Sequence, residues 1–160
     1  MGRSVEVTTA IAQFMRELEG AWEAHREALV RRDLAAALAP MVAEPSVTHR
    51  PAMTGGTGRQ AVERFYAGLV LPADLALSRI SRTVDRWRLV EETTVSFTHD
   101  RELPWLLPGV EPTFRRAEVL AIAVVGFHRT KIRSVRVLWD HATLTAQLGV
   151  TVPVATAPAR

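Results

Sequence analysis

Hydrophobic residues in the first thirty positions recur with the period of an α-helix. An apolar residue stands at every third or fourth position, which places one stripe along a helix; the stripe contains Ile11, Phe14, Met15, Leu18, Trp22 and Leu29. Thr8 or Thr9 is predicted to cap the first turn, and Arg31 and Arg32 suit the negative C-terminal end. The pattern predicts a long helix that packs one face against a core.

Shorter elements are predicted in the segment that follows. A second helix should begin at Asp33 and end near Pro40, because proline cannot continue a helix. Residues 45–51 (PSVTHRP) carry a proline at each end and predict a short strand. Its position should be at a sheet edge, because proline has no N–H to donate to a neighbouring strand. Residues 53–58 (MTGGTG) predict a flexible turn, and residues 59–70 (RQAVERFYAGLV) return to helical spacing.

From residue 75 onward the pattern indicates strands. Residues 75–90 and 91–99 predict two successive strands, and residues 115–128 and 131–140 predict another pair. The segment HRTK, between the last two strands, has a length suited to a hairpin. After it, a closing helix is predicted with Asp140 as its N-cap and Gly149 as its stop.

The order of these elements predicts one α+β domain over residues 1–149, followed by a loose tail over residues 150–160. A strongly twisted sheet must bury one face, and the early helices are the cover available to it. The sheet should therefore form a cone with an open mouth. Four apolar residues lie among prolines after Asp100 and predict a loop across that mouth, or a contact with a second subunit; they are Leu103, Trp105, Leu106 and Leu107.

Composition narrows the class of protein. A chain of 160 residues that is 48% hydrophobic suits one globular domain with a substantial core. The absence of cysteine excludes disulfides, zinc–thiolate sites and thiol catalysis. The first residues lack the apolar run of a signal peptide, and the longest apolar run, VLAIAVVGF, is strand-sized. We therefore expect a cytoplasmic protein without a membrane partner.

The basic residues do not show the clustering typical of a nucleic-acid-binding protein. The sequence pI is about 10.5, but the formal net charge is only +3. Nineteen of the 20 basic residues are arginines, which are scattered along the chain and do not alternate with aromatic residues. We expect a small-molecule partner and no nucleic acid.

Three segments carry a family resemblance. Residues 46–68 (SVTHRPAMTGGTGRQAVERFYAG), 97–113 (FTHDRELPWLLPGVEPT) and 137–149 (VLWDHATLTAQLG) resemble the SnoaL-like branch of the nuclear-transport-factor-2-like superfamily. They are most similar to stand-alone proteins described as carboxymethylenebutenolidase-associated. The resemblance implies a cone-shaped, curved antiparallel sheet wrapped by helices around an apolar pocket, in a homodimer. The family includes polyketide cyclases, isomerases, dehydratases and epoxide hydrolases, so the fold does not fix the reaction.

The resemblance also implies a set of site residues. It places catalytic groups at His49, Glu92, His99 and Asp140. The substrate-binding set comprises Trp105, Leu106, Trp139, Arg82, Arg136 and Phe65. Relatives tend to carry an acid and a histidine where this chain has Val135 and Arg136. An acid–histidine pair is thus replaced by an apolar residue and a permanent cation, and any chemistry that depends on the pair would differ in this protein.

These residue types suit cofactor-independent acid–base chemistry. Cyclisation, isomerisation and dehydration need a base near an acidic C–H or O–H, and a carboxylate in an apolar cavity acquires a raised pKa. An arginine could stabilise the enolate. No spacing of His, Asp and Glu predicts a metal site. The alternatives are a non-catalytic small-molecule binding protein and a dimeric accessory subunit.

Several candidate residues have a simpler structural explanation. Asp140 could only cap a helix, and His49 could only stabilise a turn. His99 could anchor the loop that follows it. Strand alternation puts Glu91 on the face of Val95, Phe97 and His99, which should be buried, so the choice of Glu92 depends on the resemblance alone.

Overall fold

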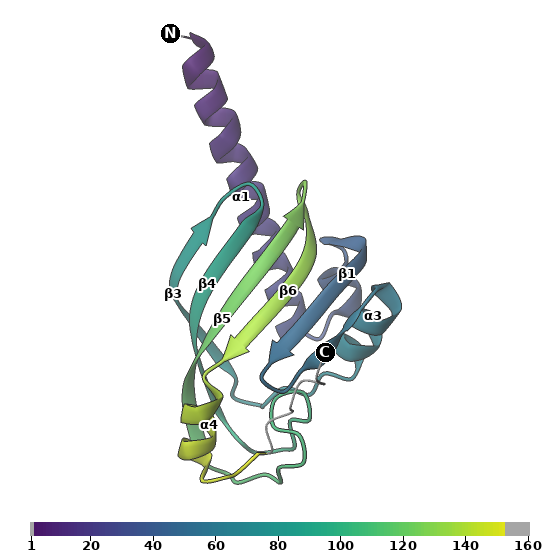
Figure 1. Ribbon diagram of the computed structural model, residues 1–160, viewed down its shortest axis with the longest axis vertical. Coiled ribbons are helices and arrows are strands. Elements are labelled where there is room, and N and C mark those ends of the chain that lie inside the picture. Colours follow the sequence, from purple (N-terminus) through teal and green to yellow (C-terminus); the bar gives the residue numbers. More distant parts are fainter. Residues whose placement is uncertain (1, 153–160) are drawn as a thin grey trace, which may run out of the picture.

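The structure, a computed structural model, describes residues 2–152 of the chain. It contains one six-stranded sheet, with helices before, between and after its strands (Figure 1). In chain order the elements are α1 (Gly2–Val30), α2 (Leu34–Leu38), β1 (Met41–Arg50), β2 (Thr54–Thr57), α3 (Arg59–Ala67), β3 (Ala76–Val84), β4 (Arg88–Thr98), β5 (Arg116–His128), β6 (Lys131–Trp139) and α4 (His141–Leu148).

The strands lie in the order β2-β1-β6-β5-β4-β3. The expected α+β fold with a curved sheet is confirmed. One pairing differs from the wholly antiparallel sheet that we predicted, because β1 runs parallel to β6. Parallel strands need a long crossover, and α3 with the β3–β5 meander provides it.

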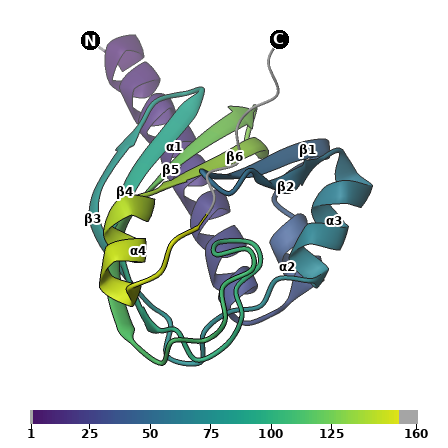
Figure 2. The ribbon, with the colours of Figure 1, turned by 60° about the horizontal axis from the view of Figure 1, so that its bottom comes forward.

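The sheet bends around α1, which covers its concave face, while α2 and α3 lie beside the β1–β2 end (Figure 2). The predicted apolar stripe of α1 supplies this contact, with Leu18 and Trp22 buried and Phe14 and Leu29 packed against the core. Ile11, which belongs to the same predicted stripe, is exposed. Among the described residues, no helix has both the length and the hydrophobicity of a membrane-spanning segment.

The N-terminal cap was predicted wrongly. Helix α1 already begins at Gly2, and the Thr9 hydroxyl donates to the backbone carbonyl of Val5 within the helix (2.9 Å). A threonine inside a helix can bond the preceding turn in this way instead of capping. The predicted helix and its C-terminal end agree with α1, and only its start is wrong.

The segment predicted as a turn contains a strand. Residues Thr54–Thr57 form β2, which pairs with β1 and occupies the sheet edge, so the edge position predicted for β1 is wrong. Gly55 makes the pairing possible, because a Cβ there would lie 2.0 Å from the Val47 carbonyl oxygen. Pro45 is tolerated in the inner strand because the β1–β6 pairing is interrupted between Met41 and Ser46.

The first β-hairpin turns earlier than predicted. Strand β3 ends at Val84, and the Asp85 carboxylate accepts hydrogen bonds from the backbone N–H groups of Trp87 and Arg88 (2.7 and 2.8 Å). An aspartate that bonds the backbone two residues ahead is a common turn device. The second predicted hairpin is confirmed, since β5 and β6 meet at His128 and Lys131.

The loop and the closing helix agree with their predictions. Leu103, Trp105, Leu106 and Leu107 are buried within this chain, so their burial does not require a second subunit. Helix α4 begins after Asp140 and ends at Gly149 in a left-handed conformation. Residues 153–160, most of the expected tail, lie outside the described residues.

Replacing Asp140 should separate its capping role from any chemistry. Its carboxylate accepts the Thr143 backbone N–H (3.1 Å), and hydrogen bonds from the Thr143 side chain and backbone lower the pKa of Asp140. We expect Asp140→Ala to lower Tm by roughly 2–4 °C, and Asp140→Asn, which keeps a capping oxygen, to leave Tm nearly unchanged. Thermal denaturation monitored by circular dichroism measures both; equal losses in the two variants would contradict the cap.

Candidate active site

The concave face of the sheet carries one row of residues with polar groups at both ends. Strand pairing aligns His49 with Val137, Val137 with Ala123, Ala123 with Glu91, and Glu91 with Arg82. His49 and Glu91 are thus three strand spacings apart, about 14 Å along the sheet. Between them lies a short apolar floor, of which Ala123 keeps 8% exposure.

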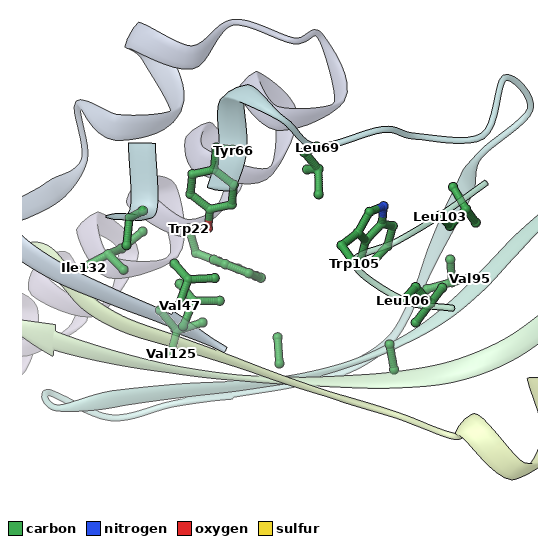
Figure 3. Close-up of a cluster of buried hydrophobic side chains, with 14 of the residues drawn as sticks. Trp22, Val47, Tyr66, Leu69, Val95, Leu103, Trp105, Leu106, Val125 and Ile132 are labelled. Carbon is green, nitrogen blue, oxygen red and sulfur yellow. The ribbon is translucent and has the colours of Figure 1, made fainter. Parts of the chain in front are cut away.

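The neighbouring row toward the α1 N-terminus is apolar from end to end. It consists of Val47, Val135, Val125, Leu89 and Val84, and its first four members are fully or almost fully buried. In Figure 3, Val47 and Val125 lie beneath Trp22, while Trp105 and Leu106 from the loop approach the sheet near Val95. The His49 row therefore runs beside the packed core.

His49 stands in a cluster of aromatic rings, which we call the His49 cluster: His49, Phe65, Trp105 and Trp139. The ring centroid of His49 lies 5.5 Å from Phe65, 5.3 Å from Trp105 and 6.3 Å from Trp139. The three aromatic residues come from α3, the loop after β4, and the end of β6. The predicted neighbours Phe65, Trp105 and Trp139 are thus brought together around His49.

Hydrogen bonding defines how His49 can act. The Trp139 indole N–H donates to His49 Nδ1 (3.1 Å), so Nδ1 must be unprotonated. Although part of the residue stays accessible, desolvation by the surrounding rings lowers the pKa of His49 to about 4. At neutral pH the ring is therefore neutral, with its proton on Nε2. No group in residues 2–152 forms a hydrogen bond with that Nε2, which leaves it as a donor.

A cleft of about 410 Å³ adjoins the His49 cluster. Phe65 and Trp105 belong to both, so the rings that touch His49 also form walls of the cleft. The remaining wall residues come from the β1–β2 turn, β2, α3, the segment that follows α3, and the loop; they are Met53, Thr54, Gly55, Arg64, Gly68, Leu69 and Pro104. The volume lies within the usual range for small-molecule sites.

At the other end of the row, Glu91 is held by donors from two elements. Its side chain is 1% exposed; Oε1 accepts from Trp22 Nε1 (3.1 Å) and contacts Arg26, and Oε2 accepts from Arg82 Nε (2.7 Å). Arg82 also pairs with Glu23 of α1 (2.8 Å). This Glu91 network joins α1 to β3 and β4, so both Arg82 and Glu91 are already occupied.

Other predicted site residues face away from the concave side. Glu92 follows the buried Glu91 on β4, so its side chain points to the opposite face. Arg136 alternates with the buried Val135 and is exposed on the same outer side. Asp140 is exposed at the start of α4. The structure does not bring these three residues to His49.

His99 and Leu106 lie inside the base of the loop. The His99 Nδ1 is 3.2 Å from Thr113 Oγ1 and accepts the Thr113 backbone N–H at 3.3 Å, which ties the two ends of the loop together. Burial lowers the pKa of His99, and its buried Nε2 has no hydrogen-bond partner in the described chain. Leu106 is buried, and its carbonyl oxygen lies 3.2 Å from His141 Nε2.

Sequence reasoning missed two partners on α1 and one cation on α3. Trp22 and Arg26 hold Glu91, and their four-residue spacing on the predicted helix was a usable signal. Arg64 gave no such signal, because its place at the cleft depends on β2, which was not predicted. Within residues 2–152, no group of three or more His, Asp or Glu side chains is arranged to hold a metal ion.

Comparison with known proteins gives a fold. No family model matches the sequence, and no curated protein matches it. Among solved structures, a protein assigned as a SnoaL-like polyketide cyclase from Jannaschia sp. CCS1 superposes with a TM-score of 0.69, 14% identity, and coverage of 86% of this chain and 96% of that chain. The chain has the SnoaL-like fold. Its structural neighbours include SnoaL-like and nuclear-transport-factor-2-like proteins, as the sequence resemblance predicted.

Two further solved structures share the fold. An LEH-like epoxide hydrolase from M. tuberculosis has a TM-score of 0.63 and 13% identity, with coverage of 84% of this chain and 90% of that chain. TerC, crystallised with polyporic acid, has a TM-score of 0.62 and 13% identity, with coverage of 84% and 99%. This SnoaL-like fold thus recurs among proteins that process small molecules, without specifying one activity.

Proposed function

We propose that the protein binds an apolar, oxygen-bearing small molecule at the cleft and that His49 donates a hydrogen bond to its carbonyl oxygen. The observation that carries the proposal is the neutral His49 ring, whose Nδ1 accepts from Trp139 and whose Nε2 has no hydrogen-bond partner within residues 2–152. Apolar walls with a few oriented polar groups are typical of small-molecule sites. The co-crystal of TerC with polyporic acid shows that a protein of this fold accepts such a guest.

The catalytic form of this proposal is a cofactor-independent cyclisation, isomerisation or dehydration. A hydrogen bond from Nε2 to a carbonyl oxygen would stabilise the enolate that forms when a water molecule in the cleft takes the proton of a neighbouring C–H, and protonation of the product carbon would return that proton. His49 would act as the electrophile and not as the base, because Trp139 keeps Nδ1 in the accepting state. The polyketide-cyclase neighbour supports a polyketide-type intermediate as substrate.

A non-catalytic binding protein is the second candidate. The observation that favours it is the position of the carboxylates: none of those in the described residues 2–152 lines the cleft. Glu91 is held by three donor side chains, and Asp140 caps α4 on the surface. Ligand-dependent thermal stabilisation without any product in mass spectrometry would select this candidate over the enzyme.

Substitution of His49 tests the proposed hydrogen bond. With 2-acetylnaphthalene as a ketone probe, we expect His49→Phe to weaken binding about 10-fold, because the donor is lost while the aromatic packing remains. Binding of 2-ethylnaphthalene, which has no oxygen, should not change. Isothermal titration calorimetry measures both affinities. Equal effects of the substitution on the two probes would contradict a hydrogen bond from His49.

The same substitution tests the enzyme. On any substrate that the protein converts, loss of the His49 donor should abolish turnover while circular dichroism still shows a folded chain. Full activity of His49→Phe would remove His49 from the mechanism.

A further inference from the structure

We propose that the cleft takes the carboxylate of an aromatic acid and that Arg64 pairs with this carboxylate. The inference rests on the proposed function, since it assumes that the cleft beside the His49 cluster is a binding site. It goes further by giving the guest a charge and by assigning a residue that the sequence analysis did not single out.

Arg64 is the one charged residue among the nine that line the cleft. In the described chain, its guanidinium makes no hydrogen bond or ion pair, although its backbone carbonyl ends α3 by accepting the Gly68 N–H. Gly68, which directly follows α3 and also lines the cleft, has no side chain to crowd the guanidinium. The cation is therefore available to a guest.

The other polar groups of the cleft are already engaged. The Thr54 hydroxyl donates to the Trp105 carbonyl oxygen (2.6 Å), and the Trp105 indole N–H donates to the Val70 carbonyl oxygen (2.6 Å). What remains is a wall of apolar and aromatic side chains with a single cation, supplied by Arg64. An uncharged polar guest would find few partners there, whereas an apolar anion would match the site.

The guanidinium of Arg64 and the aromatic walls of the cleft together define the class of ligand. A guanidinium is planar and presents paired N–H donors, which fit the two oxygens of a carboxylate. Phe65 and Trp105 offer ring surfaces, against which an aromatic group packs favourably. The guest is thus an aromatic carboxylate whose ring lies toward the His49 cluster and whose charge lies at Arg64.

Paired probes test the charge. We expect 2-naphthoate to bind the wild-type protein more tightly than 2-naphthamide, which has the same rings without the charge. Arg64→Gln should weaken naphthoate binding about 10-fold and leave naphthamide binding unchanged. The matched control is Arg133→Gln, which removes an exposed cation of β6 outside the cleft and should not alter either affinity.

The outcomes separate this inference from the proposed function. Equal affinities of wild-type protein for the two probes, or equal naphthoate affinities in Arg64→Gln and Arg133→Gln, would overturn the carboxylate site. The ketone test at His49 would still stand. Gly68→Leu should abolish binding of both probes, because Gly68 lines the cleft and a leucine side chain there would fill it. The variant should still fold, since a Cβ at Gly68 makes only ordinary contacts. Unchanged binding in Gly68→Leu would overturn both the cleft and the carboxylate site.

Discussion

Replacing Glu91 with alanine is expected to lower the free energy of unfolding by about 3–5 kcal/mol. The reason is the Glu91 network, because removal of the carboxylate leaves Arg82 and Arg26 partly buried without their common partner. It also leaves the buried Trp22 indole N–H without an acceptor. Urea denaturation followed by tryptophan fluorescence measures the loss.

Glu92→Ala is the matched control for this prediction. It removes the same side chain one position along β4, but from the outer face of the sheet, where Glu92 makes no ion pair within residues 2–152. We expect a change within about 0.5 kcal/mol, as for most surface substitutions. Similar losses in the two variants would show that the Glu91 network does not stabilise the fold.

The second large effect concerns pH and arises from His25. Its Nδ1 lies 2.7 Å from the Ala37 carbonyl oxygen and its Nε2 lies 3.0 Å from the Tyr66 hydroxyl, so the buried ring joins α1 to α2 and α3. Burial lowers the pKa of His25 from 6.5 to about 4. Between these two values the unfolded chain binds the proton and the folded chain does not. The contribution of His25 to the free energy of unfolding is therefore complete above pH 6.5. It decreases by about 3 kcal/mol as the pH falls from 6.5 to 4.

A comparison with His25→Gln isolates this contribution. Carboxylates such as Glu23, whose pKa is lowered by its hydrogen bond to Arg82, also titrate in acid, but they do so in both proteins. The difference in unfolding free energy between wild type and variant should therefore shrink from pH 7 to pH 4. If this difference stays constant across that range, His25 does not titrate as expected.

Local sequence patterns predicted most helices and strands, but they missed the edge strand β2 and the parallel pairing of β1 with β6. The spacing of apolar residues on α1 and the capping residues of α2 and α4 act within a few positions, so they were visible in the sequence. Strand β2 was hidden, because its glycines have no side-chain pattern and serve a close approach to β1. The parallel pairing was hidden as well, since it depends on contacts between distant segments.

In the candidate site, too, some residues could be proposed from the sequence and others only from the folded arrangement. His49 and its aromatic neighbours could be proposed from the sequence, because the resemblance placed all four in one pocket. Strand alternation alone favoured Glu91 over Glu92 for the inner face, and burial agrees with the alternation. Arg64 could not be proposed, since only the folded arrangement of α3 and β2 places it at the cleft.

The parallel contact between β1 and β6 has a consequence for synthesis of the chain. His49 and Trp139, which meet through this contact, are 90 positions apart. A ribosome adding residues from the N-terminus exposes β1 long before its neighbour β6 exists, and such non-local pairing slows folding. Until β6 emerges, β1 and β2 can form only a two-stranded ribbon, which has marginal stability. Chaperone protection of the nascent chain would therefore matter most between translation of β1 and release of the last strand.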